Sequence, residues 1–371
     1  MKFSVQSKLL LSHLQAVSKV VASKSPLTIL ENFLFTLEGS ELIITGSDQE
    51  TTLTSHVDVT EVEGSGKFAA NVKKLLDILK ELPDIGLTIE VNNENLEIII
   101  NYQHGHFNFI GVNGNEFPMK AVSDEVPTEF TLPVNTVIDG IQRTVFACST
   151  ETIRPVMTGI YWDIKPESIV FVASDTHKLV RYEVKSVKPG LEYSFILPAK
   201  PANVLSQILE RSEENVKISV DSKSITFETS KFSLSCLLIV GRYPNYNNVI
   251  PHDNPYEINI DRATMAAAVK RVSVFANSGG LVRFDLKTNN IKLSAQDVDF
   301  STSAEEDMTC DYTGAEMVIG FNGANVVDVV NSITNEGITL KLMDPTRAGI
   351  FVPTQNKDNE ELLILLMPMV V

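Results

Sequence analysis

One local pattern occurs three times along this chain of 371 residues. An alternating segment, FSVQ, and an amphipathic helix expected to extend to about Val21 open the chain. The pattern returns in FTLPVNTVIDGIQRTVFA from Phe130 and in YEINIDRATMAAAVKRVSVFA from Tyr256. The period of about 126 residues suits a whole domain and far exceeds that of a solenoid repeat. The repeat therefore predicts three domains with similar folds.

A second amphipathic helix is predicted inside each repeat. The three segments are NVKKLLDILKEL from Asn71, KPANVLSQILER from Lys200 and GANVVDVVNSI from Gly323. Between the helices lie short alternating segments such as ELIITGSDQ, NLEIIINY and SIVFVASD. This alternation is typical of antiparallel strands with one solvated face. We therefore expect an α+β fold in which three repeated domains each pack two helices on antiparallel sheets.

The ends of the first two repeats indicate the domain boundaries. Phe117-Pro118 and Tyr243-Pro244 occupy corresponding positions, and each precedes a polar, Pro-containing stretch suited to a linker. We place the boundaries near Ser123 and Pro251, so that the domains span residues 1–123, 124–251 and 252–371.

The first predicted helix has an apolar face and a basic face. Ser7 is its expected N-cap. The apolar stripe, expected to be buried, consists of Leu10, Leu14, Val17 and Val21. The opposite face carries no acidic residue and consists of Lys8, Ser12, Gln15 and Lys19.

The charge of the chain is unevenly distributed. The net charge of −16 argues against a protein covered in phosphate-binding residues, since DNA affinity depends on Lys and Arg. Across the six predicted helices, eleven basic and five acidic residues give about +6, which leaves about −22 for the remainder. Lys and Arg favour helix surfaces in general, but Glu is an equally good helix former and is nearly absent from these helices. The sequence therefore predicts basic helices on an acidic protein.

The remaining composition argues against several other classes. Cys148, Cys236 and Cys310 lie far apart without a CxxC pair or a nearby histidine cluster, so we expect buried, reduced thiols and no zinc site. The sequence contains no phosphate-binding loop of the kind that would indicate a nucleotide cofactor. The N-terminus lacks a signal-peptide pattern and no apolar run is long enough to span a bilayer. We expect a cytoplasmic protein without a membrane partner or a cofactor.

Domain size limits how such a chain could surround DNA. A domain of this length has a diameter of roughly 35 Å, and three or four such bodies in a ring leave a hole of only about 5 or 15 Å. Six domains leave about 35 Å, enough for duplex DNA about 20 Å across. If the basic helices line a DNA tunnel, three domains per chain predict a head-to-tail dimer. The alternative is an elongated monomer.

Four ordered segments resemble the bacterial DNA polymerase III beta subunit family, the sliding clamps. They are ASDTHKL from Ala173, GRYPNY from Gly241, GAEMVIGFN from Gly314 and the terminal Met367-Pro368-Met369. The resemblance covers the full chain and includes its threefold repeat. It implies the DNA clamp fold, a closed head-to-tail dimer ring and the function of a processivity factor on duplex DNA.

The resemblance also implies a groove that receives an extended peptide from partner proteins. Its expected residues form an apolar pocket with a polar rim: Met157, Ser174, Thr176, His177, Leu179, Pro244, Val249, Met367, Pro368 and Met369. The implied partners are the DNA polymerase III alpha subunit, an ATP-driven clamp loader and other replication and repair proteins. Val370 departs from the Arg that well-known members carry after Met-Pro-Met.

For DNA and for the second subunit, the resemblance points to two further sets of residues. The sequence-independent DNA contacts are expected at Lys24, Lys73, Lys74, Lys80, Arg154 and Lys200. Pro155 and Val156 replace aromatic residues found beside Arg154 in some members. The dimer interface is expected to join Phe107 and Phe109 to Val274 and Phe275.

Two other readings are open. An enzyme could use Asp175 and His177 as a general acid/base pair. However, Gly46-Ser47-Asp48 holds the equivalent place in the first repeat without a histidine, which favours a structural turn. A structural homo-oligomer with no role on DNA would share the repeat and the apolar interface residues.

Overall fold

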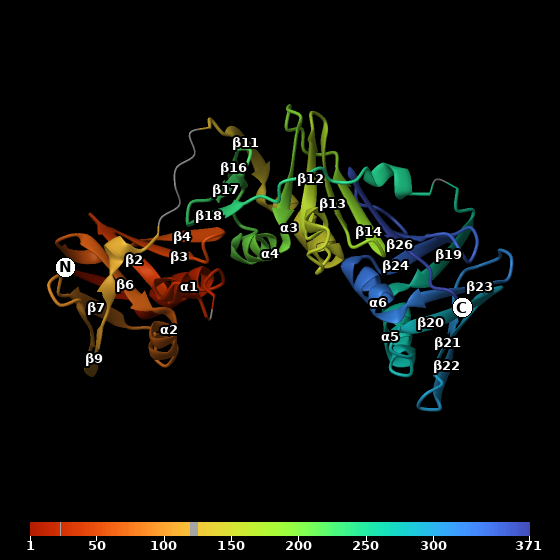
Figure 1. The fold of residues 1–371 in the computed structure, drawn as a ribbon, viewed down its shortest axis with the longest axis horizontal. Helices are drawn as coiled ribbons and strands as arrows, with labels where there is room; N and C mark the ends of the chain where they lie inside the picture. The colour runs from red at the N-terminus through yellow and green to blue at the C-terminus, as the bar shows by residue number, and fades with distance from the viewer. Residues whose placement is uncertain (23, 119–124, 252) are drawn as a thin grey trace. The chain divides into compact units, whose positions relative to one another are not determined.

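The computed structural model describes residues 1–22, 24–118, 125–251 and 253–371. The chain divides into two compact units (Figure 1). The first unit contains residues 1–134 and 204–238, and the second contains residues 135–203 and 239–371. The boundary expected at Ser123 lies outside the described residues.

Two antiparallel sheets form the first unit. The larger sheet has the order β10 (Val112–Asn113), β6 (Gly66–Asn71), β2 (Asn32–Glu38), β3 (Glu41–Ser47), β4 (Thr51–Asp58), β18 (Phe232–Leu237), β17 (Ser224–Glu228), β16 (Asn215–Val220) and β11 (Thr128–Pro133). The smaller sheet has the order β5 (Thr60–Glu63), β1 (Lys2–Gln6), β7 (Gly86–Val91), β8 (Glu97–Tyr102) and β9 (Gly105–Ile110). Strand β4 pairs with β18, so the larger sheet joins strands of the first two sequence repeats.

The second unit also contains two antiparallel sheets. One has the order β15 (Tyr193–Pro198), β12 (Gly159–Lys165), β13 (Ser168–Ser174), β14 (Lys178–Val184), β26 (Glu360–Leu366), β25 (Gly349–Pro353), β24 (Gly337–Leu342) and β19 (Tyr256–Asp261). The other has the order β22 (Thr302–Thr309), β21 (Asn290–Asp297), β20 (Leu281–Lys287) and β23 (Met317–Asn322). Here β14 pairs with β26, which joins the last two repeats.

Among the described residues, each of the six α-helices begins at the residue directly after a strand. They are α1 (Ser7–Val17), α2 (Val72–Lys80), α3 (Val134–Thr144), α4 (Ala199–Ile208), α5 (Arg262–Ser273) and α6 (Gly323–Ser332). The side chains of Asn71, Asp261 and Asn322 accept the backbone N–H three residues later and so cap α2, α5 and α6. The α+β class and the two helices per repeat are confirmed, and the repeat is a strand–helix unit that occurs twice in each third of the chain.

Two expectations about the first helix were wrong in detail. Ser7 is the first helical residue, and its hydroxyl donates to the Pro83 carbonyl at 2.7 Å instead of capping the helix. Helix α1 ends at Val17, because the amides of Lys19, Val20 and Val21 bond three residues back and tighten the chain into turns. The apolar stripe is buried at Leu10, Leu14 and Val17, and only half-buried at Val21.

The helices carry the basic charge, as predicted from the sequence. With the observed bounds they contain nine Lys and Arg residues and three Asp and Glu residues, a net charge of +6 in a chain of −16. Arg143 of α3 is an exception among these cations: it is buried, and its guanidinium carbon lies 5.0 Å from the Tyr182 ring centroid. The basic surface of the helices is therefore smaller than the sequence suggested.

The structure bears on two further expectations, and the expectation of buried thiols was wrong for Cys148 and Cys310. All three cysteines are free thiols, but only Cys236 is buried, whereas Cys148 and Cys310 are half-buried. Burial, with Asp175 nearby, raises the pKa of the Cys148 thiol to about 12. In the described residues, every helix is too short or too polar to cross a membrane.

Gly140 provides a test of packing in the second unit. A Cβ atom at this position of α3 would lie 2.5 Å from the Phe171 ring, which is fully buried beside Trp162. Replacing Gly by Ala in a helix normally stabilises by about 0.5–1 kcal/mol, but overpacking a core costs about 1–3 kcal/mol. We expect Gly140→Ala to lower the free energy of unfolding, measured by urea titration with the fluorescence of the single tryptophan, Trp162.

Two further variants serve as controls for the Gly140 experiment. Gly86→Ala should have little effect, because a Cβ there meets no atom within 4 Å. In a Phe171→Leu background, Gly140→Ala should become neutral or stabilising. An equal loss of stability with and without the Phe171 ring would contradict the packing argument.

His13 provides a test of pH dependence in the first unit. Its ring is buried in α1 against Phe232, and Nδ1 hydrogen-bonds Ser55 Oγ. Burial, reinforced by the positive charge of Lys231 and opposed by Glu210, lowers the pKa of His13 below its ordinary value of 6.5. Between the pKa of His13 in the folded chain and its pKa in the unfolded chain, the unfolded chain therefore binds more protons than the folded chain. The contribution of neutral His13 to the free energy of unfolding is complete above pH 6.5 and is lost as the pH falls through the folded pKa.

We expect the free energy of unfolding of the wild type to fall as the pH decreases below 6.5. His13→Gln, which does not titrate, should flatten this slope in urea titrations followed by circular dichroism. His104→Gln, at an exposed histidine, is the matched control. An unchanged slope in His13→Gln would exclude His13 as the source.

Candidate partner-binding and DNA-binding surfaces

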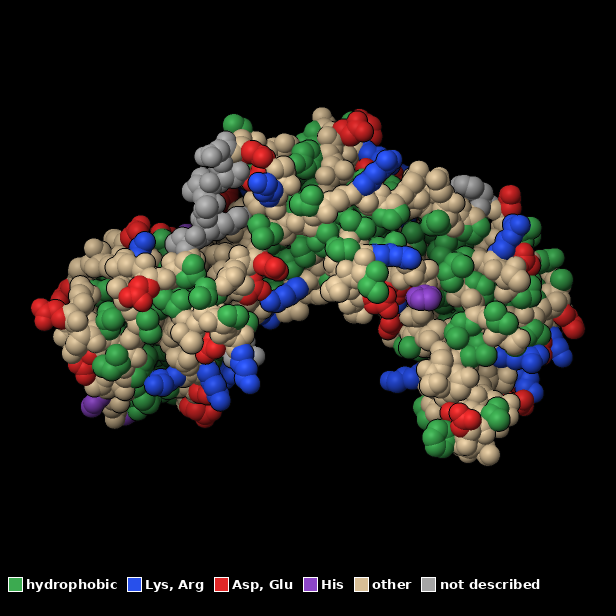
Figure 2. Space-filling view, viewed as in Figure 1, with side chains coloured by type: hydrophobic (Ala, Val, Ile, Leu, Met, Phe, Trp, Pro, Cys, Tyr) green, Lys and Arg blue, Asp and Glu red, His purple; other side chains and the backbone are tan. Residues whose placement is uncertain are grey.

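The candidate partner surface is built on three adjacent strands of the eight-stranded sheet. Leu179 of β14 lies opposite Leu365 of β26, and Leu365 lies opposite Ile350 of β25. All three side chains are buried and belong to one apolar cluster with Tyr243 and Tyr246. Figure 2 shows hydrophobic side chains at the surface of the molecule over β26 and β24. An apolar floor therefore joins strands from two sequence repeats.

The predicted groove residues lie around this cluster to different degrees. Leu179 belongs to the cluster itself. The backbone N–H of Met367 donates to the His177 carbonyl at 2.8 Å, which brings the C-terminal residues to the turn before β14. The others lie at the surface or half-buried: Met157, Thr176, Pro244, Val249, Pro368 and Met369. Ser174 is buried and acts within the turn.

The turn from Ser174 to Lys178 has a tightly determined structure. Ser174 Oγ donates to the Lys178 carbonyl at 2.9 Å. The Asp175 carboxylate accepts the backbone N–H of His177 at 2.9 Å and of Lys178 at 2.8 Å, and the Lys178 ammonium at 2.6 Å. Thr176 has a φ of 81°, in the left-handed region that such a turn requires. These bonds hold Thr176 and His177 exposed at the edge of the apolar cluster.

The first repeat contains the same turn without the histidine. Ser47 Oγ donates to the Thr51 carbonyl at 3.1 Å, and Asp48 accepts the Thr51 N–H at 2.7 Å. Gln49 has a φ of 81°, matching Thr176. The aspartate carboxylate accepts the equivalent backbone N–H in both copies of the turn. The geometry therefore favours a structural role for Asp175 over a general acid/base role with His177.

Lys178 connects this turn to a helix of the following repeat. Its ammonium is buried and donates to Asp175 Oδ2 at 2.6 Å and to Asn325 Oδ1 at 3.0 Å. Asn325 lies in the first turn of α6. A buried ammonium needs such partners, so the position of the turn is tied to that of the helix.

Sequence reasoning missed the aromatic part of the candidate partner surface. The Tyr161 and Tyr243 rings are stacked with centroids 4.9 Å apart, and Tyr246 donates a hydrogen bond to Asp163 at 2.8 Å. Burial raises the pKa values of both Tyr243 and Tyr246, so both hydroxyls stay protonated at neutral pH. The segment GRYPNY contained two of these rings, but only the folded sheet brings Tyr161 beside them.

The lysines predicted to contact DNA are exposed. Lys73, Lys74 and Lys80 lie on α2, where Figure 2 shows a group of Lys and Arg side chains, and Lys74 Nζ lies 5.4 Å from the Phe109 ring centroid. Lys24 is exposed after α1 in the same unit. In the second unit, Arg154 and Lys200 are also exposed. Asp77 is exposed between the α2 lysines and reduces their positive potential.

The predicted interface residues lie beside two strand edges. Strand β9 is an edge of the five-stranded sheet and β22 an edge of the four-stranded sheet. Phe109 is only 9% exposed and contributes to the core, whereas Ile110 next to it is 67% exposed and was missed. Val274 and Phe275 follow α5 and are 78% and 40% exposed. Exposed apolar side chains beside an unpaired strand edge favour association with another chain.

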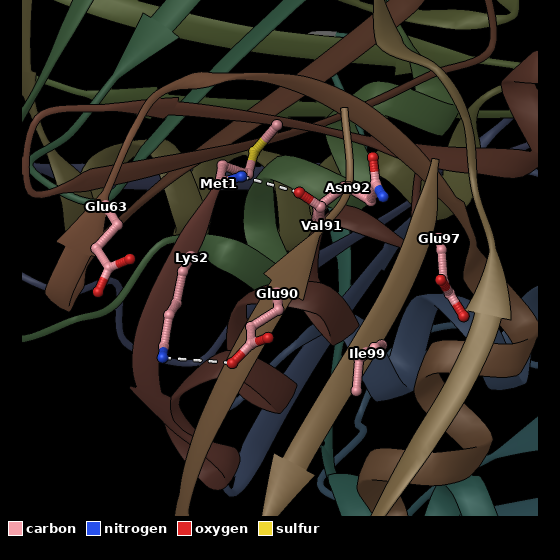
Figure 3. A pocket seen from close by; sticks show the side chains of 8 residues that line it. All are labelled: Met1, Lys2, Glu63, Glu90, Val91, Asn92, Glu97 and Ile99. Carbon is pink, nitrogen blue, oxygen red and sulfur yellow. Dashed lines mark hydrogen bonds and ion pairs between the residues drawn. The ribbon is translucent and has the colours of Figure 1, made fainter. Parts of the chain in front are cut away.

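A separate hollow of about 480 Å³ lies on the five-stranded sheet (Figure 3). Several of its polar groups already have partners: Lys2 pairs with Glu90 at 3.3 Å, the N-terminal ammonium donates to the Val91 carbonyl, and Glu97 accepts from Asn108. No group of three or more potential ligands able to hold a metal ion is found among the described residues. The geometry of this hollow therefore indicates no ligand.

Three family models match consecutive parts of the chain. The N-terminal domain of the DNA polymerase III beta subunit matches residues 1–121, the central domain residues 131–245 and the C-terminal domain residues 247–370. The chain belongs to the bacterial DNA polymerase III beta subunit family. Its three-domain clamp fold is confirmed, although the boundaries at Ser123 and Pro251 remain predictions.

Curated relatives and solved structures of this family match over the full length. The beta sliding clamps of Pseudomonas putida and Staphylococcus epidermidis are 27% and 26% identical, with 100% and 99% of both chains covered. The crystal structure of the Pseudomonas aeruginosa sliding clamp bound to griselimycin is 26% identical, with a TM-score of 0.93 and 100% of both chains covered. The similarity to these sliding clamps thus extends over all three repeats.

Proposed function

We propose that this chain is a DNA sliding clamp. Two copies form a closed ring around duplex DNA and tether a DNA polymerase to it. The observation that carries this proposal is the match of all three clamp domains, in order, along the whole chain. The net charge of +6 on the helices of a chain at −16 supports it independently, since DNA held by a ring needs a basic inner surface.

The ring closes through two of the unpaired strand edges, β9 and β22. Strand β9 of one copy pairs with β22 of the other, and Val274 and Phe275 pack against Phe107 and Ile110. The edges β9 and β22 belong to different sheets, so each copy offers one of each. Two such contacts close a head-to-tail dimer instead of an open filament.

DNA is held by topology more than by affinity. Lys24, Lys73, Lys74, Lys80, Arg154 and Lys200 are exposed cations that contact phosphates without reading bases. The helices supply no base-reading element, so binding is independent of sequence and sensitive to salt. The chain itself performs no catalysis, and a separate ATP-driven loader opens the ring.

Partner proteins bind the candidate partner surface through an extended peptide. Its apolar floor accepts Leu or Phe anchors, and the exposed Thr176 and His177 contribute polar contacts at the rim. Methionines at 367 and 369 adapt to several related peptides because their side chains are flexible and polarizable. The partners are the DNA polymerase III alpha subunit, the clamp loader and other replication and repair proteins that carry such peptides.

Retention on circular DNA tests the ring. We expect wild-type protein, loaded with a clamp loader and ATP, to co-elute with nicked circular duplex in high salt and to be lost when the circle is cut. Phe275→Asp should yield monomers by sedimentation and abolish retention, because it would bury an unpaired charge. Phe275 is the better test than Phe109, whose replacement would damage the core. Equal retention on linear and circular DNA would refute the ring.

In the same assay, Lys24, Lys73 and Lys74 together changed to Glu should load slowly and show a smaller salt slope while remaining dimeric. The control changes Lys67, Lys223 and Lys287, exposed lysines outside the helices, to Glu. Both variants alter the net charge equally. An identical defect in the two would attribute the effect to total charge instead of to Lys24, Lys73 and Lys74.

Truncation tests the candidate partner surface. Strand β26 ends at Leu366, so removing Met367 to Val371 leaves the sheet intact. We expect the truncated protein to remain a folded dimer and to lose binding of a labelled polymerase-derived peptide in fluorescence anisotropy. His177→Ala and Leu179→Ala should weaken binding less, and Val126→Ala, at a position 95% exposed in the other unit, should not change it. Unchanged affinity in the truncated dimer would show that the surface is wrongly assigned.

A further inference from the structure

A second hollow, of about 490 Å³, lies beside the C-terminal residues. It is lined by Arg283, Val318, Pro345, Thr346 and the run from Pro368 to Val371. Pro368 and Met369 therefore belong both to this hollow and to the predicted peptide groove. Val370 is 96% exposed here, in the position where well-known family members carry Arg. The two shared residues, Pro368 and Met369, therefore connect the candidate partner surface to this hollow.

The C-terminal residues are fixed on the four-stranded sheet by a glycine. Met369 N–H donates to the Gly320 carbonyl at 2.8 Å. A Cβ at Gly320 would lie 2.8 Å from Val371 Cγ2 and 3.0 Å from the Met369 carbonyl oxygen, so only glycine permits this approach. Gly320 pairs with Arg283 of β20, which places the guanidinium-bearing residue beside the bound C-terminal segment.

Arg283 is the only charged side chain among the hollow's lining residues, and it is exposed. None of the ion pairs within the described ranges of the chain involves Arg283. Two acidic side chains near it have other partners: Glu305 pairs with Lys292 at 2.7 Å, and Asp344 accepts from the Thr346 hydroxyl at 2.6 Å. An available guanidinium at one end of an apolar hollow is suited to a carboxylate held in extended chain.

We propose that the hollow binds the flanking part of the same partner peptide, and that an Asp or Glu side chain of this flank pairs with Arg283. The inference rests on the proposed function, since the anchor of the peptide occupies the candidate partner surface. The apolar side chains of Val318, Pro345 and Val370 contact the flank and limit water around the ion pair. This ion pair therefore contributes more to the binding free energy than an ion pair in full solvent does.

Labelled peptides that share one apolar anchor test the proposal. One set has a short extension at the N-terminal end of the anchor, and a second set has it at the C-terminal end. Within each set the extension carries Asp, Asn or Lys at one fixed position, and the affinity is measured by fluorescence anisotropy. With wild type, we expect the Asp peptide to bind about three- to tenfold more tightly than the Asn peptide. This preference should vanish with Arg283→Gln, and Arg283→Glu should favour the Lys peptide.

Lys287→Gln is the matched control, because Lys287 is exposed on the same strand, four residues from Arg283. Its effect on the Asp preference should be negligible. An equal loss with Arg283→Gln and Lys287→Gln would overturn the proposal in favour of general electrostatics, as would equal binding of the Asp and Asn peptides. If the anchor peptide itself fails to bind wild type, the proposed function fails as well, and the two failures are thereby distinguished.

Discussion

The antiparallel pairing of β14 with β26 is the interaction on which the candidate partner surface depends. Seven residue pairs, from Lys178–Leu366 to Val184–Glu360, align two strands that lie about 180 residues apart in the chain. This register puts Leu179 beside Leu365 and, through β25, beside Ile350. A slip of one residue would place Leu179 and Leu365 on opposite faces of the sheet and separate them. The surface therefore exists only because a C-terminal strand completes a sheet begun in the middle of the sequence.

The first unit contains a corresponding pairing of strands from two repeats, between β4 and β18. In both sheets a strand that would otherwise be an exposed edge of one repeat is paired with a strand of the next. Such pairing satisfies backbone groups that would otherwise invite aggregation. Strands β9 and β22 are two of the sheet edges that stay unpaired, and they are the edges used in the proposed contact between copies. The repeat thus accounts for both the continuity within the chain and the proposed contact between chains.

Two charged side chains illustrate how burial separates structural from functional positions. Lys178 and Arg143 carry the same kind of charge as Lys73, but both are buried and held by specific partners. A buried cation without such partners would be strongly destabilising. Arg283, by contrast, is exposed beside an apolar hollow and takes part in no ion pair of the described structure. The position of a cation in the fold, and not its presence in the sequence, therefore decides whether it can meet a ligand.

The sequence by itself determined the threefold repeat, the strand–helix pattern and the bias of basic residues toward helices, because hydrophobic periodicity and composition are local properties. It also identified the turn at Asp175, since a Ser-Asp pair at the end of a strand has a local hydrogen-bonding role that the first repeat shares. Only the tertiary structure decided that Tyr161 stacks on Tyr243, that Phe109 is a core residue and that Arg283 lies beside Met369. These contacts depend on the pairing of strands distant in sequence, and a local pattern does not encode the register of such pairs.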